Sequence, residues 1–138
     1  MSSLYFNSLN DDSKKRYIEK LTFNSFQLPD PLDEEVRKVF YCSTRLPNVS
    51  IFDIYSYLVE KNKMYSKLAF KDYVSLPCYN YVSSGKVKSI KCYRNEIGVC
   101  VIATEVEASQ TAKKIHLPWI VSTHDGEILS GHCTCMAG

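Results

Sequence analysis

The chain has 138 residues, of which 45% are hydrophobic and 23% are charged. These shares are ordinary for a globular protein, so the composition argues against disorder, and the length leaves no room for two large domains. Seventeen Lys and Arg against fifteen Asp and Glu give a formal charge of +2, which is too balanced to indicate a nucleic-acid partner by itself.

The first residues have no basic and apolar leader, and no apolar run approaches the ~20 residues that a membrane-spanning helix needs. We therefore expect an intracellular protein with no membrane partner. In that setting, six cysteines indicate reduced thiols or metal ligands more than three disulfides. Cys42, Cys78, Cys92 and Cys100 stand among apolar residues, where buried free cysteines are common, and we expect them to be structural.

Short helices are predicted in the first half of the chain. Polar residues 11–13 lead into a helix over residues 14–21, which has Tyr17, Ile18 and Leu21 on one face. Prolines at 29 and 31 break the chain, and the acidic residues 33–35 then favour a second helix that runs through Phe40.

Two more helices follow. Ser50 and Asp53 have the spacing of an N-cap and an N3 acid, and an apolar stripe with helical spacing follows, formed by Ile51, Ile54, Tyr55 and Leu58. Ser66 can cap a fourth helix from residue 67 to about residue 76, with its apolar side chains inward: Phe70, Tyr73 and Val74. Pro77 interrupts that helix.

The apolar pattern changes to a period of two after Gly85. Residues 86–93 and 99–106 predict a hairpin around a turn at 94–98, residues 115–123 predict a third strand with a proline near its start, and an Asp-Gly turn leads into a fourth strand over residues 128–135. The fold class is therefore α+β, with a helical region over residues 1–84 and a four-stranded antiparallel β-meander over residues 85–138.

Two surface features allow more than one interpretation. Eight of the ten tyrosines lie between Tyr41 and Tyr93, where they could stack on bases or simply pack the helical layer. The stretch from Lys61 to Lys91 is mostly basic, and it could contact an acidic partner or form an ordinary solvated surface.

Cys133 and Cys135 are the residues that indicate chemistry. Two positions apart on a predicted strand, both thiols point to the same face, with Cα atoms about 6.6 to 6.8 Å apart. They can converge on one zinc ion, for which the Zn–S distance is about 2.3 Å. A C-x-C motif alone is weak evidence, because two cysteines can simply be structural thiols.

The sequence around this pair adds a resemblance. Residues 119–138 place a strand, an Asp-Gly turn, a second strand and Cys133-Thr134-Cys135-Met136-Ala137-Gly138 in the order of a SWIM-type zinc finger, which the segment resembles. The resemblance implies that Cys133 and Cys135 are the first two ligands of a structural Zn²⁺. It also implies that a later Cys and His, on a helix beyond Gly138, complete the site.

The resemblance extends over roughly residues 57–138 to animal proteins that pair this finger with a YqaJ-type viral recombinase nuclease domain, and more weakly to residues 12–21. It implies that the chain is the front part of a longer protein, cut within the finger, and that a nuclease domain follows.

The histidines are weaker candidates. His132 should face the side of the strand opposite to the two thiols, so we expect a surface histidine there. His124 in the turn and His116 on the neighbouring strand remain reserve ligands. No Gly-rich phosphate loop, G-x-S-x-G or H-E-x-x-H motif is present in the sequence, so we expect neither catalysis nor a small-molecule substrate.

Three functions remain open. The first is a zinc-dependent module that binds DNA or another protein, with Lys86, Lys88, Lys91 and Arg94 as possible phosphate contacts. The second is a non-catalytic accessory region of a YqaJ-type nuclease, and the third is a metal-free protein-interaction domain. A nuclear location would suit a DNA-binding finger, although Lys14-Lys15-Arg16 is too short to indicate one.

Overall fold

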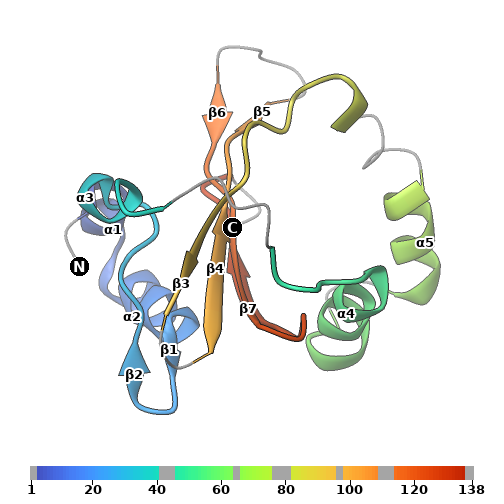
Figure 1. Ribbon diagram of the computed structural model, residues 1–138, viewed down its shortest axis with the longest axis horizontal. Helices are drawn as coiled ribbons and strands as arrows, with labels where there is room; N and C mark the ends of the chain where they lie inside the picture. The colour runs from blue at the N-terminus through green and yellow to red at the C-terminus, as the bar shows by residue number, and fades with distance from the viewer. Residues whose placement is uncertain are drawn as a thin grey trace.

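The computed structural model describes residues 3–40, 46–63, 66–75, 82–95, 98–108 and 114–135. Its centre is a four-stranded antiparallel sheet in the order β3 (Lys91–Arg94), β4 (Val99–Ala103), β7 (Trp119–Thr123) and β8 (Ile128–His132). Helices lie on both sides of this sheet (Figure 1). The predicted α+β class with an antiparallel meander is therefore confirmed.

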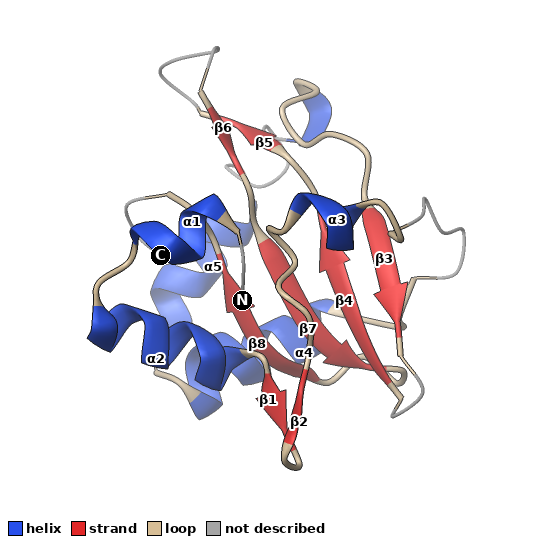
Figure 2. Cartoon of the chain, turned by 90° about the vertical axis from the view of Figure 1, so that its left-hand side faces the viewer, coloured by secondary structure: helices blue, strands red, loops and turns tan. Residues whose placement is uncertain are grey.

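The strands are shorter than predicted. The predicted strand over residues 115–123 is divided into β6 (Ile115–His116) and β7, with Leu117 and Pro118 between them. Proline cannot donate to the hydrogen-bonded ladder, so a break at this point is expected. β6 pairs with β5 (Val106–Glu107) in a separate two-stranded sheet, which extends beyond one end of the main sheet (Figure 2).

The N-terminal helices cover one side of the sheet. They are α1 (Leu4–Ser8), α2 (Asp11–Lys20) and α3 (Glu34–Arg37). α2 begins before the predicted residue 14, because the Asn10 side chain caps it by accepting from the Ser13 N–H. α3 ends at Arg37 rather than at the predicted Phe40. α1 was not predicted, and neither was the hairpin β1 (Thr22–Phe23) to β2 (Phe26–Gln27).

The second helical layer lies on the opposite side of the sheet. α4 (Ile51–Tyr55) begins with the predicted capping box, in which Ser50 and Asp53 each satisfy a backbone N–H of the other. The helix then widens into a π-helical segment, η1 (Ser56–Lys61), so the predicted apolar stripe does not continue as regular α-helix. Ser66 caps α5 (Lys67–Ser75) as predicted, by accepting from the Ala69 N–H. The expected inward side chains of Tyr73 and Val74 lie outside the described residues, as does Pro77.

The main hydrophobic core lies between the N-terminal helices and the sheet. The helical side contributes apolar residues from the first 40 positions, and the sheet contributes alternate residues of β4 and β7. These buried core residues are Phe6, Tyr17, Leu21, Leu28, Leu32, Phe40, Val99, Val101, Ala103, Trp119 and Val121. The two regions on either side of the predicted boundary near residue 84 therefore share one core.

We refer to the side of the sheet that carries this core as the core face. The opposite side, which α4 and η1 cover, is the second face (Figure 1). Because side chains alternate along a strand, Cys100 and its neighbour in the sheet, Ser122, belong to the second face, where both are buried. Among the described helices, none has the length and apolar character that would let it cross a membrane.

Candidate metal-binding thiol pair

Cys133 and Cys135 lie immediately after β8, which ends at His132 rather than at the predicted residue 135. The expectation that both cysteines lie on a strand is therefore wrong, although the chain still brings the thiols together. A bend at Thr134 and Cys135 directs the Cys135 N–H to the Cys133 Sγ, at an N···S distance of 3.3 Å. Both side chains are half-buried.

The bend is fixed by a contact outside the cysteine pair. The Leu117 N–H, in the break between β6 and β7, donates to the Thr134 Oγ1 at 2.9 Å. The break caused by Pro118 thus leaves a backbone donor that a regular strand would have used in its ladder. Thr134, which lies between the two cysteines, accepts this hydrogen bond. The bend that carries the thiols is therefore held to the segment between β6 and β7.

The prediction that His132 is a surface histidine is wrong. Its side chain is half-buried on the core face of the sheet, where the ring centroid lies 5.0 Å from that of Tyr17 and 5.8 Å from that of Trp119. The Tyr5 hydroxyl lies 2.8 Å from its Nε2, and the Lys20 Nζ lies 3.0 Å from its Nδ1. Because the sheet packs against helices on both sides, the His132 side chain is partly covered by the N-terminal helices.

Burial and charge determine the protonation of this region. Burial lowers the pKa of His132 to about 4, with Lys20 adding to the effect, so the imidazole is neutral at pH 7. Burial also raises the pKa of Cys133 to about 11, assisted by the adjoining Cys135 thiol. A metal that binds Cys133 would therefore have to displace a proton.

The described residues fit part of a zinc site. Two adjacent thiols suit Zn²⁺, but a structural zinc needs four protein donors. No group of three or more His, Cys, Asp or Glu side chains within the described part of the chain is arranged to hold a metal ion. Both His132 nitrogens are occupied by Tyr5 and Lys20, which leaves this imidazole no free lone pair for zinc.

The reserve histidines are not brought to the thiols either. His124 lies in the turn between β7 and β8, where the Arg94 Nη1 is 3.0 Å from its Nε2 and 3.2 Å from its Nδ1. This turn is at the end of β8 opposite to the cysteines. His116 belongs to β6 and forms no metal-binding group with them among the described residues.

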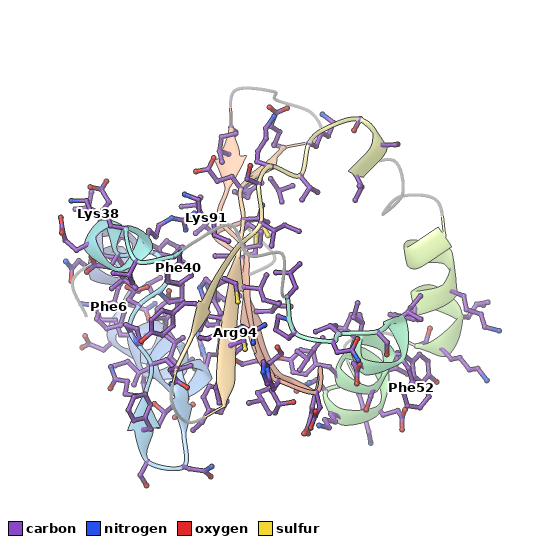
Figure 3. All side chains as sticks on the ribbon, in the orientation of Figure 1. Phe6, Lys38, Phe40, Phe52, Lys91 and Arg94 are labelled. Atoms are coloured by element: carbon purple, nitrogen blue, oxygen red, sulfur yellow. The ribbon has the colours of Figure 1, made fainter. Side chains whose placement is uncertain are left out.

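The four cations suggested as phosphate contacts do not form one face. Lys91 pairs with Ala103 and Arg94 pairs with Cys100, so these two side chains leave the sheet on opposite sides. In Figure 3, Lys91 lies toward α3 and Arg94 lies between the sheet and the second helical layer. Lys88 forms an ion pair with Glu107, at an N···O distance of 2.7 Å.

Cys92 and Cys100 are buried in the second face of the sheet, as expected for structural cysteines. Burial raises the pKa of both thiols, so neither is an activated nucleophile. Cys42 and Cys78 lie outside the described residues.

Sequence reasoning missed Tyr5 and Lys20 as neighbours of the candidate site. Tyr5 and His132 are separated by 127 positions, and Lys20 and His132 by 112. No periodicity or spacing in the sequence relates residues this distant. The only available signal was the predicted helix that ends near Lys20, and α1, which carries Tyr5, was not predicted.

Comparisons with other proteins add no assignment: no known family, no curated protein and no solved structure matches this chain.

Proposed function

We propose that the chain provides the first half of a zinc site, with Cys133 and Cys135 as two thiolate ligands, and that the site orders a protein-interaction or DNA-interaction surface. The observation that supports this proposal is the bend at the end of β8, where the Cys135 N–H is directed at the Cys133 Sγ and the two thiols adjoin each other. The two remaining donors are those that the SWIM-type resemblance places after Gly138. The zinc would be structural and non-catalytic.

The bend already has features that a thiolate–zinc site uses. The Cys135 N–H is directed at the Cys133 Sγ, and an N–H donor stabilises negative charge on sulfur. The thiols are half-buried, which limits competition from water. An intracellular, reducing compartment belongs to the same proposal, because it keeps both cysteines available as thiols.

Another protein is favoured over DNA as the partner. The basic residues are divided between two sides of the sheet and partly neutralised, so they supply no continuous phosphate-binding surface. In contrast, large apolar side chains are exposed on the second helical layer: Ile51 (60% exposed) and Phe52 (71%) on α4, and Leu68 (70%) on α5. Such exposed apolar residues are typical of protein-binding surfaces.

The proposal is tested by zinc analysis of the purified protein. The chain is produced with about 30 further residues of its own reading frame after Gly138, to include the later Cys and His that the resemblance implies. We expect one zinc per chain, and loss of that zinc in Cys133→Ser. The same analysis of the 138-residue chain should show weak, easily chelated zinc, because two thiolates make an open site.

Cys100→Ala is the matched control. It removes a thiol from the second face of the sheet and leaves the bend at residues 133–135 intact, so its zinc content should equal that of the wild type. Absence of zinc from the extended wild-type chain would exclude the proposal. Equal loss of zinc in both variants would show that general misfolding, rather than ligand removal, releases the metal.

A further inference from the structure

The second helical layer leaves large apolar side chains in contact with water. Ile51 and Phe52 of α4 and Leu68 of α5 are mostly exposed, and no residue of α4 or η1 is fully buried. The N-terminal layer, in contrast, buries its apolar side chains in the core. A group of large exposed apolar side chains, unlike a single one, is typical of a surface that another molecule covers.

Two aromatic rings join the helices that carry these side chains. The Tyr55 ring of α4 meets the Phe70 ring of α5 edge-on, with 5.3 Å between the ring centroids. Ile51 and Phe52 precede Tyr55 by four and three positions, so they lie one turn earlier on the same side of α4. Phe52 lies on the side of this layer that is away from the sheet (Figure 3). The exposed apolar side chains of α4 therefore border its junction with α5.

The α5 side of the junction is basic. The segment between Glu60 and Asp72 contains four lysines and no acidic residue. Lys67 and Lys71 are exposed, and neither forms an ion pair with any described residue. They are four positions apart and therefore lie on one side of α5, and Leu68, three positions before Lys71, belongs to the same side. An exposed apolar side chain on α5 is thus flanked by two ammonium groups.

We propose that this surface binds an acidic amphipathic helix of a partner protein. We call it the α4–α5 surface and define it by Ile51, Phe52, Lys67, Leu68 and Lys71. Apolar side chains on one side of such a helix would cover the apolar part of the surface, and its carboxylates would pair with the two ammonium groups. A second copy of this chain fits less well, because two α5 helices would oppose like charges.

This inference rests on the protein-binding part of the proposed function, and it does not require zinc. The residues of the α4–α5 surface are all present in the 138-residue chain. The layer is also joined to the sheet by an ion pair between Lys61 of η1 and Glu127 in the turn between β7 and β8, at an N···O distance of 2.6 Å. Partner binding and zinc binding can therefore be measured separately.

Other anionic partners match the surface less well. A nucleic-acid backbone offers phosphates to the lysines, but it offers no apolar group to cover Ile51 and Leu68. A membrane surface favours a helix with one continuous apolar face. On α5, the exposed leucine lies beside two lysines instead.

The test begins with a random library of peptides of about 16 residues, long enough for four helical turns, selected for binding to the 138-residue chain. We expect the selected peptides to be acidic, with apolar residues at helical spacing. One selected peptide is then labelled and titrated with variants by fluorescence anisotropy. Phe52→Ser combined with Leu68→Ser should weaken its binding about tenfold or more, and so should Lys67→Glu combined with Lys71→Glu.

Matched controls remove the same kinds of side chain elsewhere. Leu4→Ser removes an exposed apolar side chain from α1, and Lys15→Glu reverses an exposed charge on α2, both in the N-terminal layer. Neither should change the affinity for the peptide. All of the substituted side chains are exposed, so each variant should keep the Trp119 fluorescence of the wild type.

Three results would overturn the inference: a selection that yields no acidic peptide, a peptide whose affinity is equal in the wild type and in the α4–α5 variants, and equal loss in the controls. Binding of phosphatidylserine vesicles or of a single-stranded oligonucleotide, lost in the same variants in place of peptide binding, would assign the surface to a membrane or to nucleic acid. The Cys133→Ser variant should still bind the peptide. Absence of zinc from the extended chain would then refute the zinc site alone, whereas absence of peptide binding would refute this inference alone.

Discussion

At the scale of single residues, the most constrained polar group is the carboxylate of Asp30. It is 3% exposed and accepts hydrogen bonds from the Ser3 hydroxyl, the Tyr17 hydroxyl and the Leu32 N–H. A buried carboxylate is costly unless such donors satisfy it. The sequence indicated only that Asp30 lies between two prolines, and the structure shows that it connects α1, α2 and the segment before α3.

Tyr17 gives this network a pH dependence. Burial is the main cause that raises the pKa of Tyr17, and the hydrogen bond to Asp30 and its charge add to the effect. In the unfolded chain the phenol loses its proton near pH 10, while the folded protein retains it, so the unfolded state binds fewer protons above that pH. The stability that Tyr17 contributes should be complete below pH 10 and decline as the pH rises beyond it.

We expect the free energy of unfolding, measured by urea titration between pH 8 and pH 11, to fall more steeply in the wild type than in Tyr17→Phe above about pH 10. Both proteins share every other ionisable group, so the difference between their two curves is the relevant quantity. Parallel curves for the two proteins would show that Tyr17 does not retain its proton.

At the scale of elements, the turn between β7 and β8 packs closely against the segment that precedes α4. Gly126, between β7 and β8, has a φ of 104°, and a Cβ built there would lie 2.1 Å from the backbone oxygen of Asn48. The Asn48 N–H also donates to the His124 carbonyl, at 3.3 Å. The segment that leads into α4 therefore packs directly on this turn.

Gly126→Ala should destabilise the protein by about 3 kcal/mol or more, because it adds a clash with backbone to the strain of a positive φ. Gly98→Ala is the matched control: Gly98 has a similarly positive φ of 79°, but nothing lies within 4 Å of the added Cβ. It should cost only about 1 kcal/mol. Urea unfolding of both variants measures the difference, and equal costs would show that Asn48 does not pack on the turn.

At the scale of the whole molecule, the core joins the first 40 residues to the sheet. The only tryptophan of the chain, Trp119, is fully buried on β7, and its ring meets the Tyr17 ring edge-on, with 5.7 Å between centroids. Without α1 and α2, the core face of β4 and β7 would lose its covering layer and expose its apolar residues to water.

A chain that begins at residue 85 should therefore not form a native sheet. We expect its Trp119 fluorescence to be shifted to the red and its NMR spectrum to lack dispersion, and a separate peptide of residues 1–40 should restore both signals at least in part. A well-dispersed spectrum of residues 85–138 alone would show that the β region folds without the shared core. This measurement would also decide whether the boundary near residue 84 separates two domains.

Local features were those that the sequence predicted well. The Ser50–Asp53 capping box, the Ser66 cap and the four strands with alternating side chains all depend on residues close together in the chain, where cap chemistry and side-chain periodicity act. Helix α1 was missed because its five residues are too few to show a helical period. The π-helical segment was missed because a stripe of apolar residues fits an α-helix of 3.6 residues per turn and a wider helix equally well.

The candidate site shows the same division. The sequence by itself determined that the two cysteines lie close together, because two positions along the chain limit the Cα separation to about 7 Å in any backbone conformation. Only the tertiary structure decided what surrounds them: His132 is enclosed by Tyr5, Tyr17, Lys20 and Trp119, contacts that arise because the shared core folds the N-terminal helices onto the last strand. Contacts across more than a hundred residues depend on how whole layers pack, and no local pattern encodes them.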